Sequence, residues 1–100
     1  MVTNFNWGPS GDLKKVLRDL SFRYWLQKKV AHELKVGRKE AHLTQVQVAD
    51  ALNICQSAVS KYEAGKVSPD LTLLLSFCYL YGWTFEEFLL RLNIRTKGRF

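Results

Sequence analysis

The sequence has few residues that could build a metal centre or a disulfide framework. Its only cysteines, Cys55 and Cys78, form no CxxC motif, and its only histidines, His32 and His42, stand alone. Two isolated thiols are typical of a reducing compartment rather than of a secreted disulfide scaffold. The chain also shows no cluster of His, Cys, Asp and Glu and no nucleophile–base pair, so we expect no metal, no cofactor and no enzymatic activity.

Proline and glycine are scarce, with 2 and 6 residues among 100. Stretches of alternating apolar and polar residues, which would indicate β-strands, are absent. Together these absences predict an all-α fold.

Long apolar runs are missing as well. The longest, Leu71 to Tyr81, contains Thr72 and Ser76 and is too short to span a bilayer. The amino-terminal residues lack the basic region and apolar run of a signal peptide. We therefore expect a single domain in the cytoplasm, without membrane contact.

What the chain has in excess is positive charge. It carries 15 Lys and Arg against 9 Asp and Glu, which gives a net charge of +6 and an isoelectric point near 9.6. A basic surface favours a polyanionic partner, because phosphates release their counterions when they are neutralised. With 47% hydrophobic residues the chain can also bury a core, which argues against disorder.

The first part of the chain is predicted to be an arm followed by helix. Residues 1–11 are rich in Asn, Gly, Pro and Ser and are expected to form a flexible arm. After the arm, apolar residues recur at helical spacing. One bent helix or two helices would fit this pattern, and we expect two, with a break near Ser21. The helical domain is expected to span residues 12–92, followed by a short basic tail over 93–100.

Two short helices joined by a tight turn form the clearest pattern in the sequence. Thr44 and Gln47 have the spacing of a capping box that opens the first helix, Gln45–Leu52. Asn53 tolerates the left-handed conformation of a tight turn, and the second helix, Gln56–Glu63, follows it. The residues expected to face inward are Val46, Ala49, Leu52, Val59 and Tyr62.

Capping residues also mark the helices that follow. Gly65 is expected to cap the second short helix, and Gly82 to end a helix that begins with Ser68 as N-cap and Pro69 as its first residue. Thr84 then opens a final helix with a second capping box. The helical period assigns four residues of this region to the core, namely Leu71, Leu74, Leu75 and Cys78.

The stretch TQVQVADALNICQSAVSKYEAGKVSPDL, residues 44–71, resembles the Cro/C1-type helix-turn-helix family, which includes many phage repressors. The resemblance covers roughly residues 30–91 and identifies residues 44–65 as the helix-turn-helix. It implies a lambda-repressor-like five-helix domain, here with an additional N-terminal helix. The matching positions are Thr44-Gln45, Val48-Ala49, Leu52-Asn53, Gln56-Ser57, Ser60, Glu63, Gly65 and Pro69.

The sequence departs from the family pattern at three positions. Asn53 replaces the usual Gly of the turn, and Ala64 replaces a common Asn. Cys55 replaces the usual Ser or Thr at the start of the recognition helix and is a poorer cap. A thiol at a helix N-terminus has a lowered pKa, which would suit a redox role. We favour the simpler interpretation, that Cys55 is a small residue filling the turn.

The resemblance implies which side chains read DNA bases. The first, second and sixth residues of the recognition helix are Gln56, Ser57 and Lys61. Gln56 would bond adenine through both atoms of its amide, and Lys61 would reach the acceptors of guanine.

The resemblance also implies phosphate contacts and a structural ion pair. Gln45 matches a glutamine that binds phosphate and braces the first recognition residue, while Ser60 and Lys66 are expected to contact phosphate. Arg38 and Glu63 match positions that form a structural salt bridge.

The region from Leu71 to Leu92 is unusually apolar, with 15 such residues among 22. Because one small domain could not hide all of them, we expect a dimer or partner surface. In the alternative that we favour less, the amino-terminal helix covers this surplus within one chain. A two-fold homodimer would place two recognition helices about 34 Å apart on an inverted repeat. The residues expected in the surface are Phe77, Tyr81, Trp83 and Phe85.

These observations predict a sequence-specific double-stranded DNA-binding protein, a transcriptional regulator of bacterial or phage origin that acts as a repressor. Its expected location is the cytoplasm, on the nucleoid when it is bound to DNA. The alternative is an antitoxin that neutralises a toxin protein by direct contact and also represses its own operon.

Overall fold

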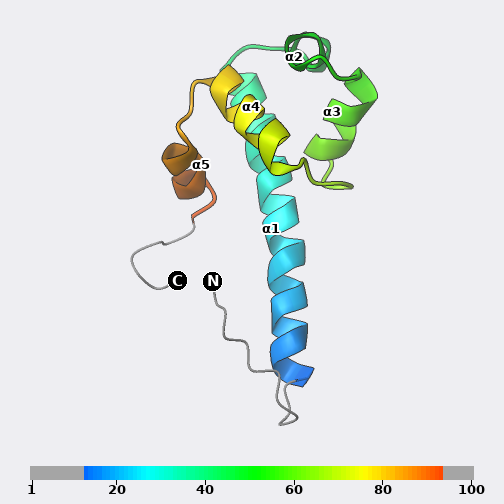
Figure 1. The fold of residues 1–100 in the computed structure, drawn as a ribbon, viewed down its shortest axis with the longest axis vertical. Helices are drawn as coiled ribbons and strands as arrows, with labels where there is room; N and C mark the ends of the chain where they lie inside the picture. The colour runs from blue at the N-terminus through cyan, green and yellow to red at the C-terminus, as the bar shows by residue number, and fades with distance from the viewer. Residues whose placement is uncertain (1–12, 94–100) are drawn as a thin grey trace.

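The computed structural model describes residues 13–93, with side chains from Leu20 onward (Figure 1). This part of the chain is all-helical, as predicted, and contains no strand. The expected arm over residues 1–11 and all of the expected basic tail except Asn93 lie outside the described residues. None of the described helices is long and apolar enough to cross a membrane. The five helices are α1 (Leu13–Glu40), α2 (Gln45–Leu52), α3 (Gln56–Glu63), α4 (Leu71–Tyr81) and α5 (Phe85–Arg91).

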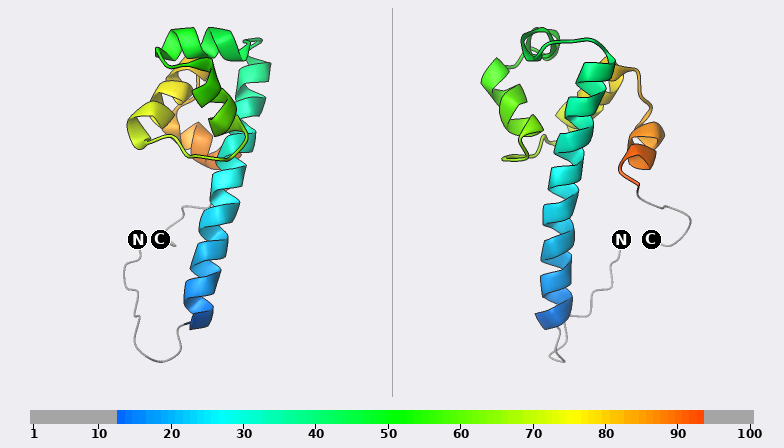
Figure 2. Two further views of the ribbon diagram at one scale, coloured as in Figure 1. Left: turned by 90° about the vertical axis from the view of Figure 1, so that its right-hand side faces the viewer. Right: turned by 180° about the vertical axis from the view of Figure 1, so that it is seen from behind.

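Helix α1 is one continuous helix of 28 residues, so the expected break near Ser21 is wrong. The physical reason is that no proline or glycine lies between Leu13 and Val36, and a single exposed serine does not interrupt a helix. Only the C-terminal half of α1 packs against the other helices, and its N-terminal half projects from them (Figures 1 and 2). The long α1 therefore serves both as a wall of the domain and as a protruding element.

The core lies where the C-terminal half of α1 meets the other four helices. Every helix contributes to it, and the side chains of Leu34, Val48, Val59 and Phe77 are completely buried. The prediction that Val46 faces inward is wrong, because Val46 is 55% exposed while Val48 and Ala49 are buried. Both choices satisfy the helical period of α2, and packing against α4 selects the face that carries Val48 and Ala49.

Helix α4 begins later than predicted. Its N-cap is Asp70 rather than Ser68, because the Asp70 carboxylate accepts a hydrogen bond from the Leu73 backbone N–H at 2.8 Å. The inward face also differs from the prediction. Phe77 and Cys78 are buried, whereas Leu71 is 63% exposed and Leu75 is 41% exposed.

Tyr81, at the end of α4, and Trp83, after it, fill a space beside α1 that Gly37 leaves open. A Cβ atom at Gly37 would lie 2.5 Å from Trp83 Cζ2 and 2.8 Å from Tyr81 Cδ2, so only glycine fits here. Trp83 stacks on Phe88 with ring centroids 5.8 Å apart, and the Arg91 guanidinium lies 4.2 Å from the Trp83 ring centroid. These contacts anchor the C-terminal part of the domain to α1.

The same contacts correct the predicted dimer surface. Phe77 is fully buried in the core, and Tyr81 and Trp83 pack against that core within one chain. Phe85 alone among the predicted residues is exposed, at 42%. The C-terminal half of α1 absorbs much of the surplus, while the projecting half leaves its own aromatic residues exposed.

Candidate nucleic-acid interface

Helices α2 and α3 form a helix-turn-helix with the predicted bounds. The capping box that opens α2 is present, since Thr44 accepts from the Gln47 backbone N–H at 3.1 Å and Gln47 accepts from the Thr44 N–H at 2.8 Å. Asn53 ends α2 in the left-handed conformation, with φ 57° and ψ 47°. The Ile54 N–H then donates to the Ala49 carbonyl at 3.0 Å, which closes the turn. The chain thereby reverses between the helices without a glycine.

A chain of polar side chains connects α1 to the start of α3. Arg38 donates from Nε to Glu63 Oε2 at 2.7 Å and from Nη2 to Glu63 Oε1 at 3.1 Å. Gln45 donates to Glu63 Oε1 at 3.1 Å, and Gln56 donates to Gln45 Oε1 at 2.8 Å. Arg38 also donates to the Leu43 carbonyl at 2.9 Å. We call Arg38, Glu63, Gln45 and Gln56 the polar relay. Glu63, at its inner end, is buried, and Gln56, at its outer end, is exposed.

The Arg38–Glu63 pair is largely removed from solvent. The side chain of Glu63 is 3% exposed and that of Arg38 is 12% exposed. The hydrogen bond to Glu63 raises the pKa of Arg38 above its ordinary value, so the guanidinium remains charged. A buried pair with two parallel hydrogen bonds fixes the relative position of α1 and α3.

Tyr81 lies at the inner side of this pair. Its hydroxyl is buried and finds no hydrogen-bond partner among the described residues. Burial raises the pKa of Tyr81, and the nearby Glu63 carboxylate raises it further. Tyr81 is therefore a neutral phenol over the physiological pH range.

The residues predicted to contact DNA lie on the exposed side of α3 or next to it. Gln56, Ser57, Ser60 and Lys61 are exposed, whereas Val59 and Glu63 of the same helix are buried. Gln45 is partly buried because it joins the polar relay. Lys66 is exposed in the loop that follows α3. The predicted base-reading residues thus lie on the exposed face of α3, with Gln45 hydrogen-bonded to Gln56 and Lys66 in the loop beyond the helix.

The N-terminus of α3 is open toward solvent. Its N-cap, Cys55, makes no capping hydrogen bond from its side chain to a backbone N–H of the helix, in agreement with the expectation that cysteine caps poorly. Free N–H groups and the positive end of the helix dipole attract an anion such as phosphate. The Cys55 thiol instead lies 3.3 Å from the Ser57 hydroxyl, and this hydrogen bond lowers the pKa of Cys55.

One contact that supports the site was not visible in the sequence. The Gly65 carbonyl, at the end of α3, accepts a hydrogen bond from Gln27 at 2.7 Å and lies 3.5 Å from Lys28 Nζ. These contacts tie the loop that carries Lys66 to α1. The partners are more than 35 residues apart in the chain, so no local pattern could reveal them.

Comparison with known families gives one match. The helix-turn-helix family matches residues 34–88, which is more than half of the chain and runs from the last two turns of α1 into α5. No curated protein and no solved structure matches the chain. The described residues contain no group of three or more His, Cys, Asp or Glu placed to hold a metal ion.

Proposed function

Because the chain belongs to the Cro/C1-type helix-turn-helix family of DNA-binding regulators, we propose that it is a transcriptional repressor that recognises a specific double-stranded sequence through α3. Residues 56–61 of α3 enter the major groove, and the loop with Lys66 follows the adjacent phosphates. Repression results from occupation of promoter DNA. The net charge of +6 supports binding to a polyanion of this kind.

The observation that carries the proposal is the orientation of Gln56. Its amide donates one N–H to Gln45 Oε1 at 2.8 Å, and Gln45 is itself held by the buried Glu63. The second N–H and the carbonyl oxygen of Gln56 remain available. One donor beside one acceptor is the arrangement that pairs with N7 and N6 of adenine. The polar relay therefore presents Gln56 as a preorganised adenine reader.

The other exposed residues complete the interface. Lys61 donates to guanine O6 and N7, and Ser57 contacts either base of its pair. Gln45, Ser60 and Lys66 bind phosphate and set the register of the protein on the duplex. The interface thus has one group of residues that recognises the bases and another that binds the DNA phosphates.

Selection of bound duplexes from a random pool tests the proposal. We expect a defined sequence, arranged as an inverted repeat if the regulator binds as a two-fold dimer. Gln56→Ala and Lys61→Ala should each weaken binding by about 1–3 kcal/mol and relax the preference at one base pair. Lys29→Ala is a charge-matched control, since Lys29 lies on the face of α1 opposite Arg38 and pairs with Glu33 at 3.6 Å. Wild-type affinity in both α3 variants would refute the assignment of the recognition helix.

Repression itself needs a separate measurement. A reporter gene driven by a promoter that contains the selected sequence should lose expression when the protein is produced. Increased expression would identify an activator instead and would leave the DNA-binding assignment intact.

An antitoxin is the second candidate, and a surface on α4 favours it. Leu71, Leu75 and Tyr79 form an exposed apolar stripe in which Tyr79 is 88% exposed. The stripe borders a groove of about 620 Å³ between α2 and α4, which includes Ala51 and Leu80 in its lining. A toxin encoded by a neighbouring short reading frame would occupy this groove. Co-expression with that product should yield a complex that Tyr79→Asp disrupts, and failure to form it would remove this candidate.

A further inference from the structure

One face of α1 carries a row of basic side chains. Residues that follow each other at intervals of four, three and four lie one above another on a helix, and here they are Lys28, His32, Lys35 and Lys39. We call these four residues the basic row. All four are exposed, and none of them belongs to an ion pair within the described part of the chain. The charges of the three lysines are therefore open to a partner.

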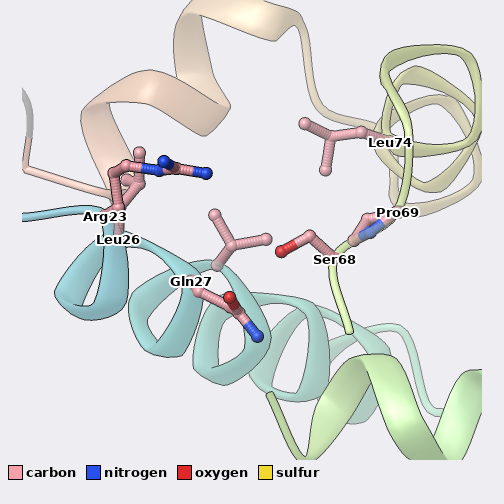
Figure 3. Close-up of a pocket in the computed structure, with 7 residues that line it drawn as sticks. Arg23, Leu26, Gln27, Ser68, Pro69 and Leu74 are labelled. Atoms are coloured by element: carbon pink, nitrogen blue, oxygen red, sulfur yellow. The ribbon is translucent and has the colours of Figure 1, made fainter. Parts of the chain in front are cut away.

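The basic row lies on the side of α1 that faces away from α4. Leu26 and Val30 line a pocket of about 290 Å³, and Leu74 of α4 forms part of its opposite wall (Figure 3). Lys28 is two residues from both Leu26 and Val30, which is about 200° around the helix. Figure 1 shows α4 in front of α1, and no other helix lies in front of α1 when the molecule is seen from behind (Figure 2, right). The face that carries the basic row is therefore uncovered.

Lys28 joins the basic row to the loop that follows α3. Its Nζ atom lies 3.5 Å from the Gly65 carbonyl oxygen and 5.4 Å from the centroid of the Tyr24 ring. A Cβ atom at Gly65 would lie 2.9 Å from Lys28 Cδ, so the lysine side chain passes directly over this glycine. Lys66, the next residue, is exposed in the same loop. The basic row thus continues into a loop for which we proposed phosphate contacts.

We propose that the basic row is a further phosphate-binding surface, which holds the DNA backbone beside the groove that α3 enters. The proposal rests on the proposed function, because the row meets DNA only when α3 lies in a major groove. Lys28 and His32 precede the family match, which begins at residue 34. Part of this surface therefore lies outside the matched domain.

The distance between α1 and α3 places the basic row near a DNA backbone. The two helices are in contact through Arg38 and Glu63, and packed helices lie about 8–10 Å apart. The major groove is about 12 Å wide and is bordered by a phosphate backbone on each side. When α3 occupies the groove, α1 lies over one of these borders. Lys35 is three residues from Arg38, or about 60° around the helix, so it lies next to the side of α1 that faces α3.

Charge and length favour duplex DNA as the partner. The row extends about 16 Å from Lys28 to Lys39, and each DNA strand carries one negative charge per about 3.4 Å of the duplex axis. Lys35 and Lys39 are four residues apart, and like charges at this spacing destabilise a helix, so phosphates that cover the row would relieve a repulsion. A second copy of the chain would set lysines against lysines. For this reason we choose DNA over a second copy.

The salt dependence of DNA binding tests the proposal, because each phosphate that the protein neutralises releases counterions. Lys28→Gln with Lys35→Gln, which we call the row variant, should lower the slope of log association constant against log salt concentration by about 1.8, or about 0.9 per lost contact. Its preference among sequences should remain that of the wild type, since no base contact is removed. Fluorescence anisotropy of the selected duplex, titrated with the full chain at several salt concentrations, gives this slope. Both lysines are exposed and glutamine is a good helix former, so the row variant should keep the fold.

Arg23→Gln with Lys29→Gln is the matched control. It removes two positive charges from the same helix, but the Arg23 side chain points toward the pocket in Figure 3 and Lys29 pairs with Glu33. Because both double variants lower the net charge by two, a general attraction between protein and DNA would change their slopes equally. The control should keep the wild-type slope. Equal slopes in the two double variants, or a wild-type slope in the row variant, would overturn the proposal.

Ethylation of single phosphates shows which ones the basic row contacts. An ethylated phosphate loses its negative charge, so ethylation at a contacted position weakens binding. The wild type should be sensitive at phosphates where the row variant is not. These phosphates should adjoin the ones at which Lys66→Gln loses sensitivity, because Lys28 lies against the loop that carries Lys66. Identical ethylation patterns for the wild type and the row variant would overturn the proposal.

Failure of this inference and failure of the proposed function give different results. If Gln56→Ala relaxes the sequence preference while the row variant behaves as the wild type, the basic row has no part in binding and the proposed function stands. If the wild type binds all duplexes equally and the row variant lowers the salt slope, the row binds DNA but α3 reads no sequence. A wild type that binds no duplex would refute both.

Discussion

Arg38 of α1 and Glu63 of α3 hold each other through two hydrogen bonds, of 2.7 and 3.1 Å, in a place that solvent hardly reaches. Glu63 also accepts a hydrogen bond from Gln45, so one buried carboxylate positions three helices. The fold and the recognition surface therefore depend on the same side chain.

Arg38→Met should destabilise the domain by about 3 kcal/mol, because it leaves the Glu63 carboxylate buried without its counterion. Urea unfolding followed by circular dichroism measures this loss. The double variant Arg38→Met with Glu63→Leu removes both charges and should recover part of the lost stability. A double variant that is less stable than Arg38→Met would show that the unpaired Glu63 carboxylate does not cause the loss of stability.

Gln45 and Gln56 should act as a unit in DNA binding. Because Gln45 orients the Gln56 amide at 2.8 Å, replacing both with Ala should cost less than the sum of the two single effects, with a coupling of about 1 kcal/mol. Titration of the four proteins against the selected duplex at one salt concentration gives the coupling directly. Additive losses would mean that the two amides act independently on DNA.

Gly37→Ala should destabilise the protein by about 1–3 kcal/mol, although alanine is the better helix former. The added methyl group would collide with the Trp83 and Tyr81 rings, which are themselves enclosed by the core. Thermal unfolding compares this variant with Ser21→Ala, an exposed helical position where alanine should be neutral or stabilising. Equal stability of Gly37→Ala and the wild type would show that the aromatic cluster can move away from α1.

The two cysteines should differ in reactivity toward iodoacetamide. The hydrogen bond between Cys55 and Ser57 lowers the pKa of the exposed Cys55 thiol, whereas burial raises the pKa of Cys78. A lower pKa means more thiolate at neutral pH, so Cys55 should react first, and its rate should reach a plateau at a lower pH than that of an unperturbed thiol. Mass spectrometry of the alkylated protein locates the modified residue.

DNA should slow this reaction, because Cys55 is the N-cap of the recognition helix. Cys55→Ser removes the reactive group, restores a side-chain cap and is expected to bind DNA at least as well as the wild type. Reaction of Cys78 ahead of Cys55 in the folded protein would contradict the prediction that Cys55 is the more reactive thiol.

The features that sequence reasoning predicted correctly depend on residues close together in the chain. The capping boxes at Thr44 and Thr84 and the left-handed turn at Asn53 are present because each is completed within a few residues. The Arg38–Glu63 pair was expected from the family resemblance and not from any local rule. It lies as that resemblance implies, and it leads outward to Gln45 and Gln56.

The features that were predicted wrongly depend on distant contacts. Val46 and Val48 are equivalent to a helical period, and only the approach of α4 decides between them. Phe77 and Trp83 were predicted to lie in a partner surface. No residue near them in the chain shows that the core encloses Phe77 or that Gly37 leaves room for the Trp83 ring. The unbroken α1 was not predicted. Ser21 suggested a break, although no proline or glycine lies near it.

Helix α1 runs without a break over 28 residues, so its two ends keep a fixed distance and orientation. No glycine or proline separates residues 13–25 from Arg38 except Gly37, against which Trp83 packs, so no hinge interrupts the helix. Each residue inserted after residue 25 would advance the preceding part of α1 by about 1.5 Å and rotate it by about 100° relative to the domain. The length of α1 therefore fixes where its N-terminal residues lie relative to the helix-turn-helix.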